Sequence, residues 1–362
     1  MKYLFILGRN VELSSAEIFS YFERENIKII SKKEKKNSIL IEVNKKLKDN
    51  IIKDFGGVIA IGKILYFINE IEEKQIYLGT KNKFNYVVWN FSNQEQFHKA
   101  SDLLKQNFKS EKLKATEKRI SDFMKLQGGR TAMNLSSGKI IDEQYFVFED
   151  SFGKIIEKAD YKEIEKRDME KPVRREELSI SPRLAKIMIN LSQIKSGQKL
   201  VDCFCGIGTI LIEALIQNIQ VIGIDKDADA IEGARKNLRE FSGQDYLLIK
   251  KNSSKVKIKD ANVLVCEPDL GQILRKIPTK EEAEKTLRNY ENLMVKVLNN
   301  LQKAISGRIV FTSPLIKQNK QRLDINIKYI LGKTGLKLVK GFPISEFREN
   351  QIVGRNIFVL EK

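Results

Sequence analysis

Two aspartates on either side of a sharp glycine turn are the strongest chemical signal in this 362-residue sequence. Residues 199–204 form an apolar-rich run that contains Asp202. The turn that follows contains Gly206 and Gly208, then comes an apolar pattern with helical spacing, and a second apolar run ends on Asp225. Strand, glycine turn, helix, strand and acid, in this order, are typical of the first half of a nucleotide-binding α/β unit.

The residue types of this turn indicate a nucleoside ligand that carries positive charge. Glycine lets the backbone pass close to a ligand, and the helix after the turn presents free N–H groups. Asp225, roughly 20 residues past the turn, can accept both hydroxyls of a ribose. Asp202 does not suit a pyrophosphate but suits S-adenosylmethionine, which has an ammonium and a sulfonium. We therefore predict S-adenosylmethionine as the cofactor; a bare G-x-G turn in an unrelated α/β domain is the alternative.

Polar residues also follow the next predicted strands. Beyond Asp225 the sequence alternates between strand and helix patterns, which predicts a parallel sheet with helices on both faces. Asn252 and Glu267 lie at or just beyond the ends of the third and fourth of these strands, where such sheets bind ligands. The predicted cofactor-binding residues are Asp202, Cys205, Gly206, Gly208, Thr209, Asp225 and Asn252.

The segment Glu267-Pro268-Asp269-Leu270-Gly271 is a second candidate site. Methylation of an exocyclic amine of a base depends more on positioning than on acid–base catalysis. The carboxylate of Glu267 and the carbonyl of Pro268 can accept the two N–H groups, and the proline stiffens the loop. We predict Glu267, Pro268, Asp269 and Gly271 as catalytic residues; an ordinary strand-to-loop Glu-Pro is the alternative.

The charge of the chain indicates a polyanionic partner. The formal net charge is +18 and the isoelectric point is near 9.5. Residues 201–250 carry 5 Lys and Arg against 8 Asp and Glu, whereas residues 301–362 carry 12 against 4. Because Lys and Arg neutralise phosphates at long range, this distribution predicts a nucleic acid as substrate, although Lys-rich composition by itself explains part of the charge.

Composition excludes several other classes of protein. Hydrophobic content of 42% and charged content of 31% are typical of a soluble globular protein, and no apolar run reaches the length of a membrane span. The N-terminal residues lack a signal-peptide cleavage site. Three cysteines exclude a disulfide framework, so we expect a cytoplasmic protein. Cys203 and Cys205 have only His98 as an imidazole partner, so we predict no metal site.

The first half of the chain has an α+β pattern. We expect a helix over residues 45–55, a pair of strands that meet at Gly62, and a linker over residues 155–175 whose charged tail, residues 167–175, crosses the surface in an extended form. A basic stretch follows residue 108 and is interpreted either as an RNA-contact face or as a solvated helical face. The predicted RNA-binding residues are Lys112, Lys114, Lys118, Arg119, Lys125 and Arg130, with Arg174 and Arg175 further along.

These motifs together resemble the THUMP-domain tRNA guanosine N2-methyltransferases, the archaeal and eukaryotic family that acts on guanosine 10. Residues 202–209, Asp-Cys-Phe-Cys-Gly-Ile-Gly-Thr, resemble the family's cofactor motif Asp-Pro-Phe-Cys-Gly-x-Gly-Thr. Residues 3–18 resemble its N-terminal subdomain, residues near 80–150 with Leu135-Ser136-Ser137 resemble its THUMP domain, and residues 167–175 resemble its linker.

The resemblance implies an α/β fold in three parts. Residues 1–160 form a ferredoxin-like and THUMP RNA-binding module, residues 161–180 a linker, and residues 181–362 a Rossmann-like S-adenosylmethionine-dependent methyltransferase domain. The family usually has Asp-Pro-Pro-Tyr-Gly where this chain has Glu267-Pro268-Asp269-Leu270-Gly271, and often Asp at the position of Asn252. The chain is therefore expected to be a divergent member.

The predicted activity is methylation of the N2 amine of a guanosine in tRNA, at position 10 or nearby, by a monomer. Whether it needs a small activating protein, and whether it adds one methyl group or two, stays open. Three alternatives remain: a DNA or RNA amino-methyltransferase of other specificity, a catalytically weakened RNA-binding homologue, and an NAD(P) oxidoreductase. The last is disfavoured because Asp202 lies where a pyrophosphate would pass.

Overall fold

The computed structural model describes residues 1–135, 141–175, 180–241, 245–269, 276–319 and 321–362. Internal contacts divide the chain into two compact units. The first comprises Met1–Val11, Ile27–Lys53 and Gly57–Ala159, and the second comprises Glu12–Asn26, Asp54–Gly56 and Asp160–Lys362. Among the described residues, no helix is both long and apolar enough to cross a membrane.

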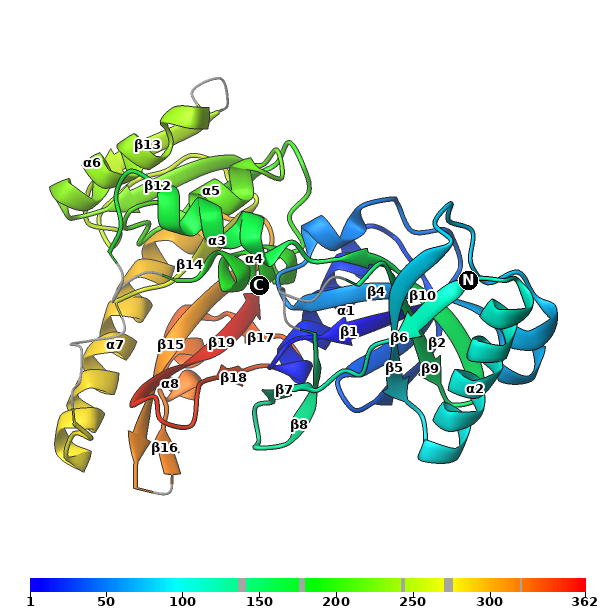
Figure 1. Cartoon of the computed structure of the whole chain (residues 1–362). Coiled ribbons are helices and arrows are strands. Elements are labelled where there is room, and N and C mark those ends of the chain that lie inside the picture. Colours follow the sequence, from blue (N-terminus) through cyan, green and yellow to red (C-terminus); the bar gives the residue numbers. More distant parts are fainter. Residues whose placement is uncertain (136–140, 176–179, 242–244, 270–275, 320) are drawn as a thin grey trace. The chain divides into compact units, whose positions relative to one another are not determined.

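An eight-stranded sheet forms the first unit (Figure 1). In sheet order its strands are β2 (Ile29–Lys35), β3 (Ser38–Val43), β1 (Lys2–Leu7), β4 (Val58–Phe67), β10 (Ser151–Lys158), β9 (Glu143–Phe148), β5 (Lys83–Phe91) and β6 (Lys114–Glu117). Strand β5 runs parallel to β9 and β6, and the other neighbours are antiparallel. Helix α2 (Gln94–Ser110) begins at Asn93, whose side chain accepts from the backbone N–H of Gln96. A separate hairpin consists of β7 (Asp122–Lys125) and β8 (Thr131–Asn134).

Two predicted elements differ from the structure, and aromatic packing explains the first of these differences. The prediction that two strands meet at Gly62 is wrong, because β4 runs through Gly62 unbroken. A Cβ on Gly62 or on Gly153 would lie 2.4 or 2.3 Å from the ring of Phe146, so both glycines make room for that buried ring. The helix predicted over residues 45–55 is also wrong, since only Ile51–Asp54 form a short 3₁₀ helix.

A nine-stranded sheet forms the second unit, and its first five strands run parallel. In sheet order these are β13 (Tyr246–Lys250), β12 (Gln220–Asp225), β11 (Lys199–Asp202), β14 (Val263–Cys266) and β15 (Ile309–Gln318). Strand β19 (Val353–Glu361) follows antiparallel to β15, and β16 (Gln321–Leu323), β17 (Lys337–Leu338) and β18 (Ile344–Glu346) pair at this edge.

Helices cover both faces of this sheet, as the alternating pattern predicted. Two hydrophobic clusters are separated by the strands: Leu200 belongs to one, and its neighbour Val201 belongs to the other. The first cluster includes side chains of α4 (Pro182–Leu191), α5 (Thr209–Leu215) and α6 (Ala228–Asn237), and the second includes those of α7 (Lys280–Leu301) and α8 (Ile327–Thr334). Residues 318–331, for which the sequence pattern indicates one helix, instead contain β16 and the start of α8.

Helix α1 (Val11–Arg24) packs in the second unit although it precedes almost all of the first. Asn190, fully buried on α4, donates hydrogen bonds to Oε1 of Glu17 and to the carbonyl of Asp54, both at 2.8 Å. Its Oδ1 accepts from Nη1 of Arg24 at 3.2 Å. One amide therefore joins three segments that are distant in the sequence.

The extended form predicted for residues 167–175 is wrong for 167–170, which are the end of a helix. Tyr161–Glu170 form α3, which begins at Asp160, whose carboxylate accepts from the backbone N–H of Glu163 at 3.0 Å. Arg167 on this helix contacts the carboxylate of Glu213, a buried residue of α5, at 3.3 Å. The segment 160–170 is thus part of the second unit.

Replacement of Asn190 by alanine tests how α1 is held. The substitution leaves buried partners on α1 and at Asp54 without their hydrogen bonds, so we expect a loss of about 1–3 kcal/mol in the free energy of unfolding. Urea unfolding followed by circular dichroism measures it. Asn299→Ala, at an exposed position on α7, is the control and should change stability by less than about 0.5 kcal/mol. Equal effects of the two substitutions would contradict this role of Asn190.

Candidate active site

Three carboxylates gather at the carboxyl ends of the parallel strands. Asp202 ends β11, Asp225 ends β12, and Glu267 directly follows β14. Asp202 is 1% exposed. Burial raises the pKa of this carboxyl well above its ordinary value; the backbone N–H of Phe204 opposes the shift, and the charges of Asp225 and Glu267 add to it. The predicted site residues from three strands are therefore within electrostatic reach of one another.

The glycine turn leaves space for a ligand. Gly206 and Gly208 have φ of 51° and 91°, in the left-handed region that favours glycine. A Cβ on Gly206 would meet no atom within 4 Å, so the space beside this residue is open. The N–H of Gly206 donates to Oδ2 of Asp225 at 3.0 Å, and the N–H of Cys205 donates to the carbonyl of Ile224 at 3.0 Å. These bonds fix the turn against the end of β12.

The remaining predicted cofactor residues lie around this turn in different roles. Cys205 is buried, and burial raises the pKa of its thiol, so the side chain is a neutral packing group. Thr209, the first residue of α5, accepts from Nζ of Lys171 at 3.4 Å. Asn252 is exposed, and its Oδ1 accepts from the N–H and the hydroxyl of Ser254 at 2.9 and 2.8 Å. Asn252 thus shapes its own turn.

The carboxylate of Glu267 is held by residues that sequence reasoning missed. Nε and Nη2 of Arg355 contact Oε1 and Oε2 at 2.5 and 3.3 Å, and the hydroxyl of Thr312 donates to Oε1 at 3.3 Å. Arg355 reaches this site because β19 is antiparallel, which brings its first residues to the carboxyl ends of the other strands. No motif around Arg355 signals this pairing.

The other predicted catalytic residues are only partly described. Pro268 is buried and Asp269 is exposed, whereas Leu270 and Gly271 lie outside the described residues. The predicted catalytic roles of Pro268, Asp269 and Gly271 therefore stay predictions.

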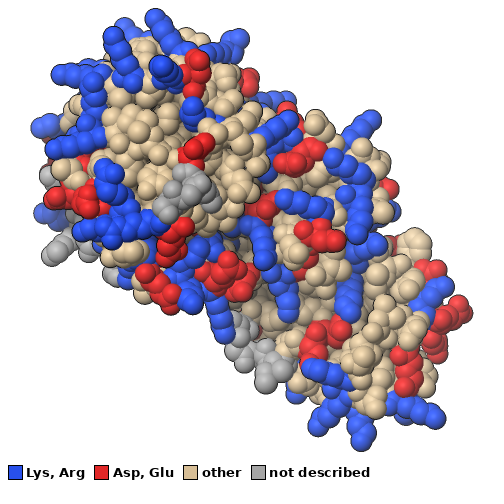
Figure 2. Space-filling view, turned by 90° about the horizontal axis from the view of Figure 1, so that it is seen from above, with Lys and Arg blue, Asp and Glu red and all other residues tan. Residues whose placement is uncertain are grey.

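The predicted RNA-binding residues of the first unit are exposed and do not lie on a helix. Lys114 is on β6, Lys125 is on β7, and Arg130 is in the turn of that hairpin. Lys112 is exposed in a turn before β6, and Lys118 and Arg119 are exposed in the irregular segment after it. The interpretation as a solvated helical face is wrong, because residues 112–130 contain only short strands and turns. Figure 2 shows that basic side chains cover much of the viewed face, with acidic ones between them.

The two later arginines differ from this group. Arg175 forms an ion pair with Asp227, at 3.1 Å from Nη1 to Oδ2, and both arginines are only partly exposed. Two hydrogen bonds lower the pKa of Asp227: the one from the backbone N–H of Asp229 has the larger effect, and the one from Arg175 comes next. Arg175 therefore contacts the N-cap residue of α6.

The cysteines and the acidic side chains of the described residues include no group of three or more that could hold a metal ion. Cys203, Cys205 and Cys266 are buried free thiols.

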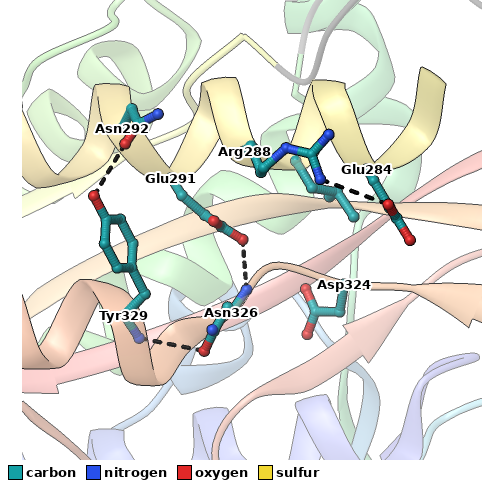
Figure 3. A pocket seen from close by; sticks show the side chains of 8 residues that line it. Glu284, Arg288, Glu291, Asn292, Asp324, Asn326 and Tyr329 are labelled. Carbon is teal, nitrogen blue, oxygen red and sulfur yellow. Dashed lines mark hydrogen bonds and ion pairs between the residues drawn. The ribbon is translucent and has the colours of Figure 1, made fainter. Parts of the chain in front are cut away.

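A separate hollow lies between α7 and α8 (Figure 3). Its volume is about 470 Å³, and it is lined by Glu284, Leu287, Arg288, Glu291, Asn292, Asp324, Asn326 and Tyr329. Glu291 reaches across it from α7 and accepts from the backbone N–H of Asn326 at 2.6 Å. None of the predicted site residues lines this hollow.

Comparisons with known proteins agree with this geometry. TrmN from Thermus thermophilus aligns over 100% of both chains with a TM-score of 0.54 and 13% identity, and therefore shares the fold. A tRNA (guanine(10)-N2)-dimethyltransferase of Pyrococcus abyssi is 24% identical over 87% of this chain and 88% of its own length. That of Methanothermobacter thermautotrophicus is 33% identical over 38% of this chain, and the match spans only 39% of that relative.

Two family models match the chain itself. One, described as an RMKL-like methyltransferase domain, matches residues 172–326, and another, described as DNA methylase, matches residues 18–236, more than half of the chain. The second model covers more than half of the chain, so the chain belongs to the family of methyltransferases that this model describes. It is also a divergent relative of the tRNA guanosine N2-methyltransferases. The family and S-adenosylmethionine as its cofactor are thereby confirmed, and the oxidoreductase alternative is excluded.

The residues of this methyltransferase fit the cofactor. The open space beside Gly206 admits a ligand next to the turn. Asp202 is a buried carboxyl whose charged form needs a cation, and S-adenosylmethionine carries an ammonium and a sulfonium.

The raised pKa of Asp202 predicts how cofactor binding depends on pH. The free protein keeps this carboxyl protonated above its ordinary range, and a bound cation favours the carboxylate. We therefore expect the affinity for S-adenosylmethionine to rise with pH and binding to release a proton. Titration calorimetry in buffers of different ionisation enthalpy measures both. Binding without proton release would contradict this assignment.

Asp202→Asn separates binding from stability. The amide can still accept from Phe204 but cannot balance a cation, so we expect roughly 10- to 100-fold weaker cofactor binding. A folded-state pKa that is raised makes the protein lose stability as pH increases through it. The variant should therefore be more stable than wild type near neutral pH without cofactor, as thermal unfolding measures. Lower stability together with unchanged binding would contradict the role given to Asp202.

Proposed function

We propose that this methyltransferase transfers a methyl group to the exocyclic N2 amine of a guanosine in tRNA, at position 10 or nearby. The carboxylate of Glu267, fixed at the end of β14 beside Asp202, is the observation that carries the proposal. The names of the relatives from Pyrococcus abyssi and Methanothermobacter thermautotrophicus support the choice of guanine and of tRNA.

The chain's own residues perform the positioning. The target guanine leaves its stack, which costs a few kcal/mol, and enters the site at the strand ends. Glu267 and the carbonyl of Pro268 accept hydrogen bonds from its amine, which aligns the nitrogen lone pair. S-adenosylmethionine, when bound, supplies the methyl group, whose bond to sulfur breaks as the nitrogen–carbon bond forms. The surplus proton on nitrogen leaves to solvent.

The first half of the chain is proposed to bind the RNA. On this proposal residues 1–160 correspond to a ferredoxin-like and THUMP module, residues 161–180 to a linker, and residues 181–362 to the methyltransferase domain. The exposed basic residues from Lys112 to Arg130 support a contact with phosphates. We further propose that the enzyme works as a monomer in the cytoplasm. Assays of the purified chain, with and without cell extract, test whether it needs an activating protein.

Incubation with labelled S-adenosylmethionine and bulk tRNA tests the activity, and analysis of the digested nucleosides identifies the product. We expect N2-methylated guanosine from the wild type. Glu267→Gln should lower the transfer rate on the order of 10²- to 10³-fold, because the amide is a weaker acceptor, with cofactor affinity kept within about twofold. Glu284→Gln, which changes a residue that lines the hollow between α7 and α8 and, in the described part of the chain, forms no hydrogen bond or ion pair with Glu267, is the control. Absence of label from all RNA, despite cofactor binding, would refute the activity.

Salt dependence tests the basic residues. Lys118→Ala combined with Arg119→Ala should weaken tRNA binding and reduce the slope of log K against log salt by about 1–2, because each phosphate contact releases counterions. The matched pair Lys333→Ala and Lys337→Ala removes two exposed charges from the second unit. Equal weakening by both pairs would mean that only net charge matters.

A DNA amino-methyltransferase is the second candidate, and the description of the model that matches residues 18–236 favours it. The two differ in the product of the labelling assay: nuclease digestion releases the label with RNase if the substrate is tRNA, and with DNase if it is DNA.

A further inference from the structure

The carboxylate of Glu267 is paired with the guanidinium of Arg355. The carboxylate and the guanidinium are largely buried, with side chains 9% and 22% exposed. Two nitrogens of Arg355 meet its two oxygens, which is the fork geometry that fixes a carboxylate in its plane. The partner therefore sets the orientation of Glu267 as well as balancing its charge.

The hydrogen bonds show which acceptor positions of the Glu267 carboxylate are still open to a substrate. Oε1 accepts from Nε of Arg355 and from the hydroxyl of Thr312, which uses both of its lone pairs. Oε2 accepts from Nη2 of Arg355 alone among the described residues. One acceptor position on Oε2 is therefore left, and the fork fixes its direction.

The surroundings explain why a cation is needed there. Asp202 lies within electrostatic reach of Glu267 and is buried. Two negative charges close together repel each other, and a cation paired with one of them offsets that repulsion. Arg355 lies on β19, on the side of β14 away from Asp202, and balances the charge of Glu267. Asp202 can then pair with the cation of the cofactor.

We propose that Arg355 is a positioning residue for methyl transfer: it holds Glu267 so that one lone pair of Oε2 receives the N–H of the target amine. This inference rests on the proposed function, since it assigns Arg355 a role through Glu267. Arg355 acts on the orientation of the amine and not on the binding of RNA phosphate.

Steady-state kinetics of Arg355→Gln with tRNA tests it. We expect kcat to fall on the order of 10²-fold, because a carboxylate that is displaced by about 1 Å misaligns the amine. KM for tRNA and the dissociation constant of S-adenosylmethionine should stay within about twofold. Arg355→Lys, which keeps the charge but loses the fork, should recover part of the rate. A rise in KM with kcat unchanged would overturn the proposal, since it would indicate a phosphate contact.

A double-mutant cycle distinguishes positioning from a general structural role. If Arg355 acts through Glu267, the variant that combines Arg355→Gln with Glu267→Gln should be no slower than Glu267→Gln alone. Multiplied losses in the double variant would overturn the proposal. Arg308→Gln is the matched control, because Arg308 also contacts a glutamate, Glu23, at 3.7 Å but precedes β15, at the opposite end of the sheet.

The outcomes separate this inference from the proposed function. Full activity of Arg355→Gln, with an active wild type, would overturn the role of Arg355 and leave the tRNA activity standing. A wild type that binds cofactor but methylates no RNA would overturn both. Thermal unfolding of each variant in the presence of S-adenosylmethionine verifies that the fold persists, and the conservative Arg355→Lys variant decides the case if Arg355→Gln unfolds.

Discussion

Negative charge held at one edge of a sheet, largely out of water, is the constraint on which this structure depends. Asp202 and Glu267 end or follow neighbouring strands, and the pKa of Asp202 is raised by burial first and then by the nearby charges, Glu267 among them. Within the described part of the chain, the fold gives a cationic partner to one of these two acids and not to the other. Glu267 is paired with Arg355 of the same chain, whereas the only group of the described residues that donates to Asp202 is the N–H of Phe204, so Asp202 favours a cationic ligand.

This difference suits the two acids to different roles, one in cofactor binding and one in orienting the base. Among the described residues, the carboxyl that has no cation beside it is that of Asp202 at the glycine turn, where we expect the positive groups of S-adenosylmethionine to bind. The carboxylate with a permanent cation lies at the loop that is proposed to receive the base. A single row of strand ends can thus bind a cation and orient a neutral amine, because one antiparallel strand brings an arginine to one of its two acids.

What could be predicted from the sequence was local. The glycine turn and the acids at strand ends are encoded within short segments, so their order along the chain predicted the parallel sheet and the position of the site. Arg355 could not be found in this way, since its contact with Glu267 joins residues 88 apart and needs the antiparallel direction of β19. The place of α1 was missed for the same reason, because Asn190 binds it from 173 residues away. The break expected at Gly62 was wrong because that glycine makes room for a ring from another strand.

The most direct test of the electrostatic account compares two ligands that differ mainly in charge. S-adenosylmethionine and 5′-methylthioadenosine share the adenosine and its sulfur, but only the first carries an ammonium and a sulfonium. Titration calorimetry of the wild-type protein near neutral pH should show S-adenosylmethionine binding at least about tenfold more tightly, as expected for a charge-assisted contact with a buried carboxylate. Equal affinities would mean that the acids at the strand ends do not recognise the cofactor's charge, and would contradict the account.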